Sequence, residues 1–581
     1  MDLDGRPSCS RRGRAGPLLR LWALLFVVAA IGFAAPAGAD VARPVYQRVL
    51  SNGLRVVICP DPQGTDVSVF VRYDVGARDE PSGLEGLAHL TEHLMFTGTK
   101  HIPAGQVLKV LSDVGATNIN GETTLDASTF HETMPPEQLE FALWLESDRM
   151  GYLLDRLDAA AVAQERAAVL NEFRDRVTDR PFGVLGAVAY AELFPKWHPY
   201  QHLTQGNVEA IQRLSLADAR AFVTTWYGPG NAVLTIAGRV DPVMAAAAVE
   251  RWFGTLPARP PPRRPALPAA SLSRSTFVRV DASVTRPRLD VHWVTPALDA
   301  PGDAELDVAA AVLSNRGAGW LERALVSPGI AVSVGAGQQS MQHASVFTVH
   351  VVLADGHRPD EALARVDHAL SRFQSDVGQS DLQRARMGWY NAKLFALESS
   401  MAWASRLAAA RLKGPLAAVY DGDVDQHSHV SPDAVRGAVR SWLGPAKRVV
   451  VAGLPVRGTP VAGRVVERTE RTPGARAPGS PGSARASSSR RRRAARAAWW
   501  LRSATDRLRW RPTSPRARCR RGPGHRFHAS RSRGESRRST TGCASSSWSV
   551  TRSRSCRFGS SSTGAARTPA RRARRAICSR R

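Results

Sequence analysis

Two histidines and a glutamate stand close together in the segment His89-Leu90-Thr91-Glu92-His93. On a helix, His89 and His93 lie about 40° apart around the axis and one turn along it, so both imidazoles can reach one ion. Glu92 can then take a proton from a water molecule beside that ion. Zinc suits such a site because it accepts imidazole and carboxylate ligands and keeps a position open for water. The alternative is a solvated helix face on which three polar residues meet.

A zinc site of this kind needs a third protein ligand. Two carboxylates follow at Glu165 and Glu172, and seven residues are close to two helical turns, so both side chains face the same way. Beside the two histidines, they fit one metal ligand and one hydrogen-bond acceptor for a ligating imidazole. An ordinary solvated acidic face is the alternative interpretation.

Hydrophobic periodicity locates the elements that must position these residues. Asn52-Gly53 separates two β-branched runs over 48–58, which predicts a hairpin. Further strands are predicted over 67–73 and 231–238, and helices over 84–96, 105–114, 136–154, 159–177 and 216–226. Because strands and helices mix without regular alternation, the pattern favours an α+β fold over a doubly wound sheet.

A proline-rich segment over 257–270 has the composition of a linker between two domains. The first domain, 41–256, carries the candidate zinc site. The second, 271–455, again reads as strand, long helix, strand and helix, from 277–294 through 304–326 and 346–352 to 447–452. The similar order predicts two similar α/β-sandwich domains, related by fold rather than by sequence.

Residues 1–39 have the pattern of a signal peptide. A basic start precedes an apolar run over about 18–33, and Ala37-Gly38-Ala39 follows as a small-residue cleavage site. The run is shorter than the ~20 residues of a membrane-spanning helix, so we expect cleaved export to the periplasm or the medium rather than an anchor. Of the six cysteines only Cys59 lies within 41–455, and no disulfide framework is expected to hold the fold.

The positive charge is confined to one end of the chain. The formal net charge is +28, but residues 471–581 hold 31 Arg and two acidic residues, which leaves −1 for residues 1–470. From 464 to 581 the composition is rich in Arg, Ser, Ala and Pro without apolar periodicity, which predicts a disordered tail. A polybasic arm that binds polyanions is one interpretation. The abrupt onset, the absence of Lys and the pair Trp499-Trp500 favour out-of-frame translation of a GC-rich gene instead.

The motifs resemble the inverted-motif zinc peptidases of the pitrilysin and insulinase type (M16), which include mitochondrial processing peptidase. The resemblance covers about residues 45–455. The segment 86–96 is similar to the family's catalytic helix almost letter for letter, and Glu172 lies 79 positions beyond His93, close to the family's separation. The resemblance implies that His89, His93 and Glu172 bind Zn2+, that Glu92 is the general base and that Glu165 supports the catalytic site.

Residues 115–124 are similar to the family's edge strand, which pairs with the substrate backbone. We carry that role over to Asn120, where Gly121 replaces the family's Ala; an ordinary strand with an Asn-Gly turn is the alternative. Family members enclose the site between two similar halves, and residues 41–455 match the first. The resemblance therefore implies a second half, from farther along the gene, a partner subunit or a homodimer.

The function that these features predict is exported, zinc-dependent endopeptidase activity on peptides or small unfolded proteins. Two alternatives from other classes are an inactive scaffold subunit of the same fold and a polyanion-binding protein that acts through its arginine-rich tail.

Overall fold

The structure is a computed structural model, and it describes residues 43–260, 262–282, 284–396, 398–414, 416, 427–455 and 465–471. The predicted signal peptide and the predicted tail beyond residue 471 lie outside the described residues.

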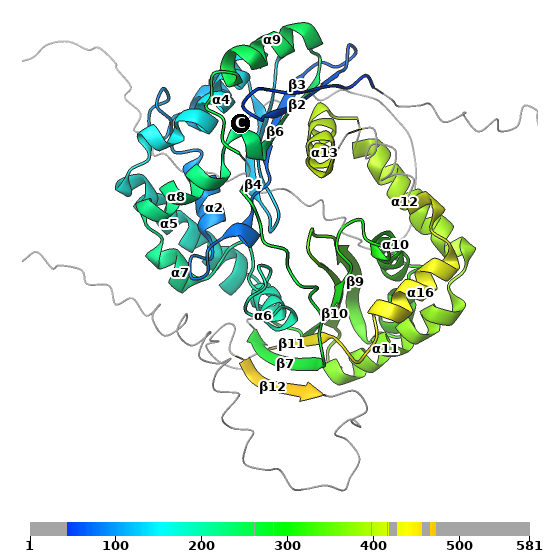
Figure 1. The fold of residues 1–581 in the computed structure, drawn as a ribbon. Coiled ribbons are helices and arrows are strands. Elements are labelled where there is room, and N and C mark those ends of the chain that lie inside the picture. Colours follow the sequence, from blue (N-terminus) through cyan, green and yellow to red (C-terminus); the bar gives the residue numbers. More distant parts are fainter. Residues whose placement is uncertain are drawn as a thin grey trace, which may run out of the picture. The chain divides into compact units, whose positions relative to one another are not determined.

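The first of two mixed sheets is assembled from residues 46–238 (Figure 1). Its strands, in spatial order, are β1 (Tyr46–Val49), β2 (Arg55–Pro60), β6 (Ala232–Gly238), β3 (Val67–Tyr73), β5 (Ser128–Met134) and β4 (Thr117–Thr123). Within this sheet, only β2 and β6 pair in parallel. The helices of this part are α2 (Leu87–Leu94), α3 (Val107–Asp113), α4 (Leu139–Arg156), α5 (Ala159–Phe173), α6 (Gly183–Leu193), α7 (Val208–Arg213), α8 (Leu216–Trp226) and α9 (Pro242–Phe253).

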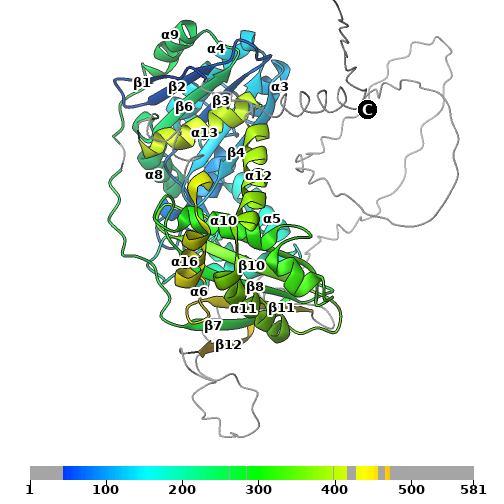
Figure 2. The same ribbon diagram turned by 90° about the vertical axis from the view of Figure 1, so that its right-hand side faces the viewer.

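The second sheet, built from residues 275–471, repeats this topology in five strands and differs in its edge strand, which comes last in the chain rather than first (Figure 2). Its spatial order is β12 (Val465–Arg471), β7 (Ser275–Ala282), β11 (Val449–Pro455), β8 (Arg288–Thr295), β10 (Ser345–Leu353) and β9 (Ala331–Gln339). Again one pair, β7 and β11, is parallel. The helices are α10 (Asp303–Ser314), α11 (Pro359–Asp376), α12 (Gln379–Ala396), α13 (Ser400–Lys413) and α16 (Pro432–Trp442). The predicted α+β class and the predicted duplication of fold are therefore confirmed.

Each sheet receives one helix from the other half of the chain (Figure 1). Helix α13 packs on β2, β3 and β6, where Trp403 and Leu407 are buried against Phe70 and Val233. In return, α6 packs on β7, β8 and β11, and the side chain of Leu185 lies 3.1 Å from the position that a Cβ on Gly453 would take. Because both faces of the first sheet are covered, β2, β3 and β6 are apolar along almost their whole length.

Four segments differ from the sequence-based expectation. Residues 447–452, expected as the final helix of the second domain, lead into and form part of strand β11, whose run of β-branched valines favours a strand. The helix expected over 304–326 ends at Ser314, because the following turn contains Gly317 with φ of +75° and Gly319, whose Cβ would lie 2.6 Å from the carbonyl oxygen of Asn315. The strand expected over 277–294 is two strands, β7 and β8, separated by a turn before Pro287. Residues 465–471, which composition assigns to the tail, pair with β7 as β12.

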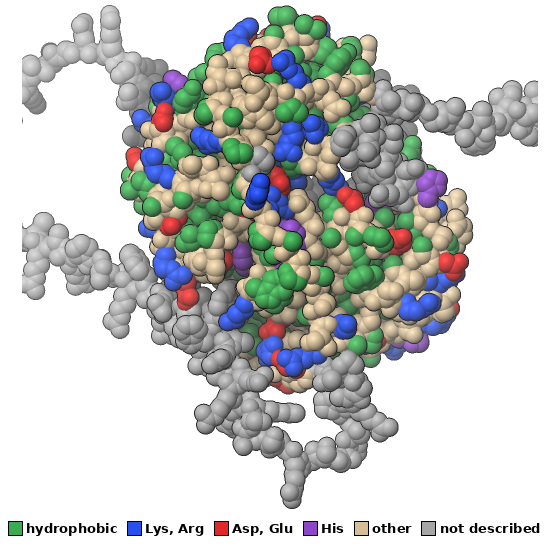
Figure 3. Space-filling model, in the orientation of Figure 1, with side chains coloured by type: hydrophobic (Ala, Val, Ile, Leu, Met, Phe, Trp, Pro, Cys, Tyr) green, Lys and Arg blue, Asp and Glu red, His purple; other side chains and the backbone are tan. Residues whose placement is uncertain are grey.

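No helix among the described residues is long and apolar enough to cross a membrane. On the face drawn in Figure 3, basic and acidic side chains are interspersed rather than gathered by sign. This mixture agrees with the near-zero net charge of residues 1–470.

Candidate metal centre

Helix α2 carries the two histidines, and a buried carboxylate fixes where it begins. Gly86 stands at its N-cap with φ of +103°, a conformation that favours glycine. The side chain of Glu80 accepts hydrogen bonds from the backbone N–H groups of Gly86 (2.9 Å) and Ala88 (2.7 Å). Two amides that the first helical turn leaves without partners are thereby satisfied. Burial raises the pKa of Glu80 well above its usual value, against the effect of these two bonds.

The two histidines and Glu172 converge on one point. His89 Nε2 lies 3.5 Å from Glu172 Oε1, and His93 Nε2 lies 3.2 Å from Glu172 Oε2. One ligand atom from each of the three residues lies within 4.8 Å of the others. Glu172 belongs to the last turn of α5, which packs against α2, so the contact between the two helices sets these distances.

These separations fit zinc. Zinc–nitrogen and zinc–oxygen bonds of about 2.1 Å in a tetrahedron place two ligand atoms roughly 3.4 Å apart, close to both measured distances. Two imidazoles and one carboxylate are also a donor set that zinc prefers, with a fourth position left for water. The residues present therefore fit Zn2+ in type and in approximate spacing.

The three candidate ligands differ in the hydrogen bonds and ion pairs that they make with neighbouring residues. His93 Nδ1 lies 3.3 Å from Glu165 Oε2, the contact that orients a ligating imidazole. His89 is buried, and its Nδ1 has no hydrogen-bond partner within the described part of the chain. Glu172 Oε1 is also contacted by Arg176 Nη1 at 2.8 Å. Burial raises the pKa of Glu172, but its bonds to the histidines outweigh that effect and hold the pKa well below its usual value.

Glu92 and the edge strand lie side by side. A Cβ on Gly121 of β4 would be 3.0 Å from Glu92 Cγ and 2.8 Å from Phe96 Cε2, so the strand approaches α2 closely. The Glu92 carboxylate is partly exposed, and no hydrogen bond to it is found among the described residues. Within the described chain, strand β4 pairs only with β5, leaves its other edge open and has a bulge between Thr117 and Asn120. The exposed Asn120 lies on this strand.

Arg149, Glu146 and Glu132 form a cluster of buried charged residues that packs against the ring of Phe96 through Arg149. The guanidinium of Arg149 is 4.7 Å from the ring centre of Phe96, and its Nη2 is 3.4 Å from Glu146 Oε1. Glu132 is buried as well, and burial together with the charge of Glu146 raises its pKa. Burial also raises the pKa of Glu146. Arg149 is therefore the cation that offsets two carboxyl groups in the wall of the site.

The metal-free site makes stability depend on pH. Burial lowers the pKa of His93, but its bonds to Glu165 and Glu172 outweigh that effect and raise the pKa to about 9. The raised pKa of His93 contributes stability that is fully present at a pH below the pKa of the unfolded chain, about 6.5. This contribution, at most about 3 kcal/mol, is lost as the pH rises to 9. We expect the free energy of unfolding of the metal-free protein, measured with urea, to fall over this range.

The zinc-loaded protein should not show this fall, because the metal takes the place of the proton. His93→Gln is the control that removes the titrating group. A metal-free protein whose stability stays flat between pH 6.5 and 9 would contradict the assigned contacts of His93.

The structure thus brings together the five predicted residues of the metal site and places Asn120 on an edge strand beside Glu92. Sequence reasoning did not identify Glu80 or Arg176. Arg176 had a signal, since it lies four residues after Glu172, the spacing of an ion pair on a helix. Glu80 had none, because its bonds to α2 depend on how the preceding loop folds.

Two family models match the chain. A model described as "Insulinase (Peptidase family M16)" matches residues 55–190, which include α2 and α5, and one described as "Peptidase M16 inactive domain" matches residues 213–388. Among curated proteins, the zinc protease PqqE of Helicobacter pylori is 27% identical over 377 residues, which are 61% of this chain and 81% of that protein. The coenzyme PQQ synthesis protein F of Pseudomonas aeruginosa is 29% identical over 293 residues, 49% of this chain and 37% of that protein.

Solved structures share the fold. The crystal structure of a protease from Helicobacter pylori superposes with a TM-score of 0.66 at 23% identity and covers 71% of this chain and all of that one. The first half of the periplasmic protease PqqL from Escherichia coli gives a TM-score of 0.59 at 17% identity, over 71% of this chain and 94% of that one. Against the longer PqqL structure, the match covers 48% of that chain.

Proposed function

Because the chain belongs to the M16 (insulinase) family of zinc metallopeptidases, we propose that it is an endopeptidase that hydrolyses peptides or small unfolded proteins. The observation that carries this proposal is the convergence of His89, His93 and Glu172 on one point with the spacing of zinc ligands. The partly exposed Glu92 beside them supplies the proton-transfer group that peptide hydrolysis needs.

In the proposed mechanism, His89, His93 and Glu172 hold Zn2+, while Glu165 keeps His93 in the required orientation. Bound zinc supplies a Lewis acid that lowers the pKa of water and polarises a carbonyl group. Glu92 accepts a proton from the attacking water and then donates it to the nitrogen of the leaving amine. Arg176 contacts Oε1 of Glu172, the oxygen that also faces His89, and helps to keep Glu172 ionised.

The open edge of β4 is the proposed place for the substrate backbone. A peptide that adds to this edge forms main-chain hydrogen bonds, which give affinity with little sequence preference. The close approach of Gly121 to Glu92 supports the idea, because a peptide on β4 then runs past the general base. Asn120, exposed on the same strand, is the proposed side-chain contact to substrate.

We also propose export and a second peptidase half. The signal pattern in residues 1–39 supports a periplasmic location, as does the likeness to a protease described as periplasmic in Escherichia coli. The fold matches one half of the longer PqqL structure, which supports a second half from the same gene, a partner subunit or a second copy.

Removal of the metal tests the proposal directly. We expect the purified protein to contain about one zinc per chain, to lose cleavage of an unstructured fluorogenic peptide after chelation, and to regain it when Zn2+ is returned. Glu172→Gln should remove both zinc and cleavage, whereas Glu165→Gln should weaken zinc affinity about 10- to 100-fold. Metal content by mass spectrometry is the measurement. Full cleavage by a zinc-free Glu172→Gln protein would refute the assignment.

A further inference from the structure

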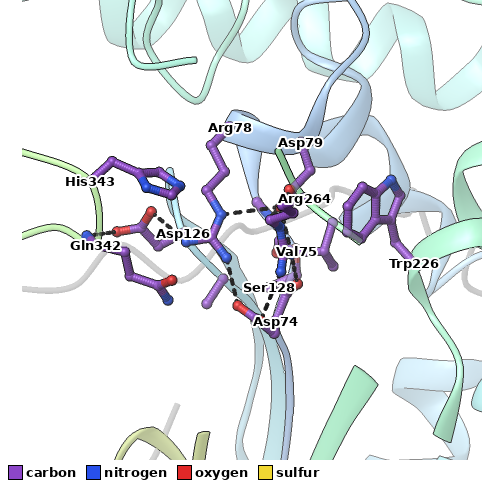
Figure 4. A network of polar contacts seen from close by, with 12 residues as sticks. Asp74, Val75, Arg78, Asp79, Asp126, Ser128, Trp226, Arg264, Gln342 and His343 are labelled. Carbon is purple, nitrogen blue, oxygen red and sulfur yellow. Dashed lines mark hydrogen bonds and ion pairs between the residues drawn. The ribbon is translucent and has the colours of Figure 1, made fainter. Parts of the chain in front are cut away.

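The turn between β4 and β5 is tied to the second sheet through one carboxylate (Figure 4). Asp126 Oδ1 accepts hydrogen bonds from Arg78 Nη1 at 2.9 Å and from the hydroxyl of Tyr200. Asp126 Oδ2 accepts the backbone N–H of Gln342 at 3.0 Å. The side chain of Asp126 is only 13% exposed, so water competes little for these bonds. Gln342 lies in the turn between β9 and β10 of the second sheet.

Arg78 is itself held in place on the side of the first sheet. It is buried and also contacts the carboxylates of Asp74, at 2.6 Å, and Asp79. Arg264, from the proline-rich segment, contacts the same two carboxylates at 2.9 and 2.6 Å. With Asp126 the group comprises three carboxylates and two guanidiniums, so both guanidiniums keep a carboxylate partner when the Asp126 charge is lost.

The β9–β10 turn is docked by apolar contacts as well. Met341 and Ala344 of this turn are buried in the apolar cluster that contains the core of the first sheet and residues from β7, β10 and β11 of the second. The backbone N–H of His343 donates to the hydroxyl of Tyr200 at 3.2 Å. The turn is therefore a fixed support against which Asp126 can hold the first sheet.

Strand β4 ends at the turn that Asp126 joins to this support. Among the described strands, β4 has a neighbour only on the β5 side, and its C-terminal end runs into the turn that contains Asp126. Backbone N–H groups of Ala77 and Arg78 donate to Thr124 and Leu125 in the same turn, at 3.1 and 3.0 Å. Gly121, five residues before Asp126, is the point at which β4 meets Glu92.

We propose that Asp126 is a positioning residue for peptide binding: by joining the β9–β10 turn to the β4–β5 turn, it holds the open edge of β4 in the place where a substrate backbone pairs. The second sheet, which contributes none of the candidate metal ligands, thereby controls the affinity of the first for substrate. This inference rests on the proposed function of β4 as the substrate strand.

Asp126→Asn is the most informative substitution, because it keeps the shape and removes one acceptor. The side-chain amide of Asn has one acceptor oxygen where Asp has two. Its NH2 group must therefore face a donor, either the Gln342 N–H or the donors of Arg78 and Tyr200, and the hydrogen bond at that position is lost. We expect KM for the fluorogenic peptide to rise about tenfold, with kcat changed less than about twofold and zinc content unchanged. Asp126→Glu, which keeps both oxygens, should recover most of the loss.

A second pair of variants isolates the bond to the second sheet. Gln342→Pro removes the backbone N–H that Asp126 accepts, whereas Gln342→Ala keeps it and alters only an exposed side chain. We expect Gln342→Pro to raise KM as Asp126→Asn does, and Gln342→Ala to match the unchanged protein. Hydrogen exchange of the amides in 117–123 should be faster in Asp126→Asn and Gln342→Pro alone, with the exchange of α2 unaltered.

Each outcome decides the proposal. If β4 exchanges at the same rate in all variants, Asp126 does not hold the strand. If β4 exchanges faster without any change in KM, Asp126 does not position the strand for peptide binding. If the unchanged protein cleaves no peptide, the proposed function fails instead, and the exchange rates still show whether Asp126 holds β4.

Discussion

Glu92→Gln should abolish peptide hydrolysis while leaving zinc in place. The amide keeps the size of the side chain but cannot accept a proton from water, and a general base of this kind contributes about 10²- to 10⁴-fold to the rate. Because the candidate ligands are His89, His93 and Glu172, the substitution removes none of them. We therefore expect kcat to fall by about 10³-fold with zinc content near one per chain.

The matched control is Glu137→Gln, the same chemical change at an exposed position in a turn before α4. It should alter neither zinc content nor cleavage. A Glu92→Gln protein that holds zinc and cleaves peptide at the normal rate would show that another group transfers the proton. Loss of zinc in Glu92→Gln would show instead that Glu92 helps to bind the metal.

Arg149→Met should strongly destabilise the fold. Methionine fills a similar volume beside Phe96, but it leaves the carboxyl groups of Glu132 and Glu146 buried without a cation. Removing one partner of a buried ion pair typically costs about 3–5 kcal/mol. We expect the free energy of unfolding in urea to fall by about that amount near pH 8.

The loss should shrink as the pH is lowered. Burial raises the pKa of Glu146, and without Arg149 it rises further, so protonation removes the unpaired charge at a higher pH than in the unfolded chain. Arg149→Met/Glu146→Gln should regain part of the stability at pH 8, and Arg156→Met, an exposed change on the same helix, should have little effect. Equal losses in Arg149→Met and Arg156→Met would refute the role given to the buried cluster.

The parts of the site that the sequence predicts are those with a local pattern. His89 and His93 are one helical turn apart, and Glu165 and Glu172 two turns apart, so each pair needs only a helix to face one way. Strands β3 and β6 and helix α8 also lie within a residue of their predicted bounds, because their apolar runs end at strong turn signals. Resemblance to a family then implied what spacing could not, namely that Glu172 is the metal ligand and Glu165 the supporting residue.

The residues that sequence reasoning missed act through long-range contacts. Glu80 caps α2 from a loop, and Asp126 accepts a hydrogen bond from a turn 216 residues away. Arg149 is buried, but the sequence pattern of its helix does not distinguish it from a charged residue on an exposed face. The expected helix over 304–326 failed for a different reason. The apolar pattern continues past Ser314, but Asn315 and two glycines that follow it end the helix there.

Because α6 packs on the second sheet and α13 on the first, the two halves do not depend on the proline-rich segment alone to stay together. Arg264 in that segment contacts Asp74 and Asp79, yet α6, α13 and the docked β9–β10 turn also join the two halves, with Trp403 buried on one sheet and Leu185 on the other. A protease that nicked the chain between 257 and 270 would therefore leave one particle on a sizing column. A fragment expressed only as far as this segment would instead lack α13 and expose the apolar sheet face around Phe70. We expect such a fragment to aggregate until the missing helix is supplied as a separate chain.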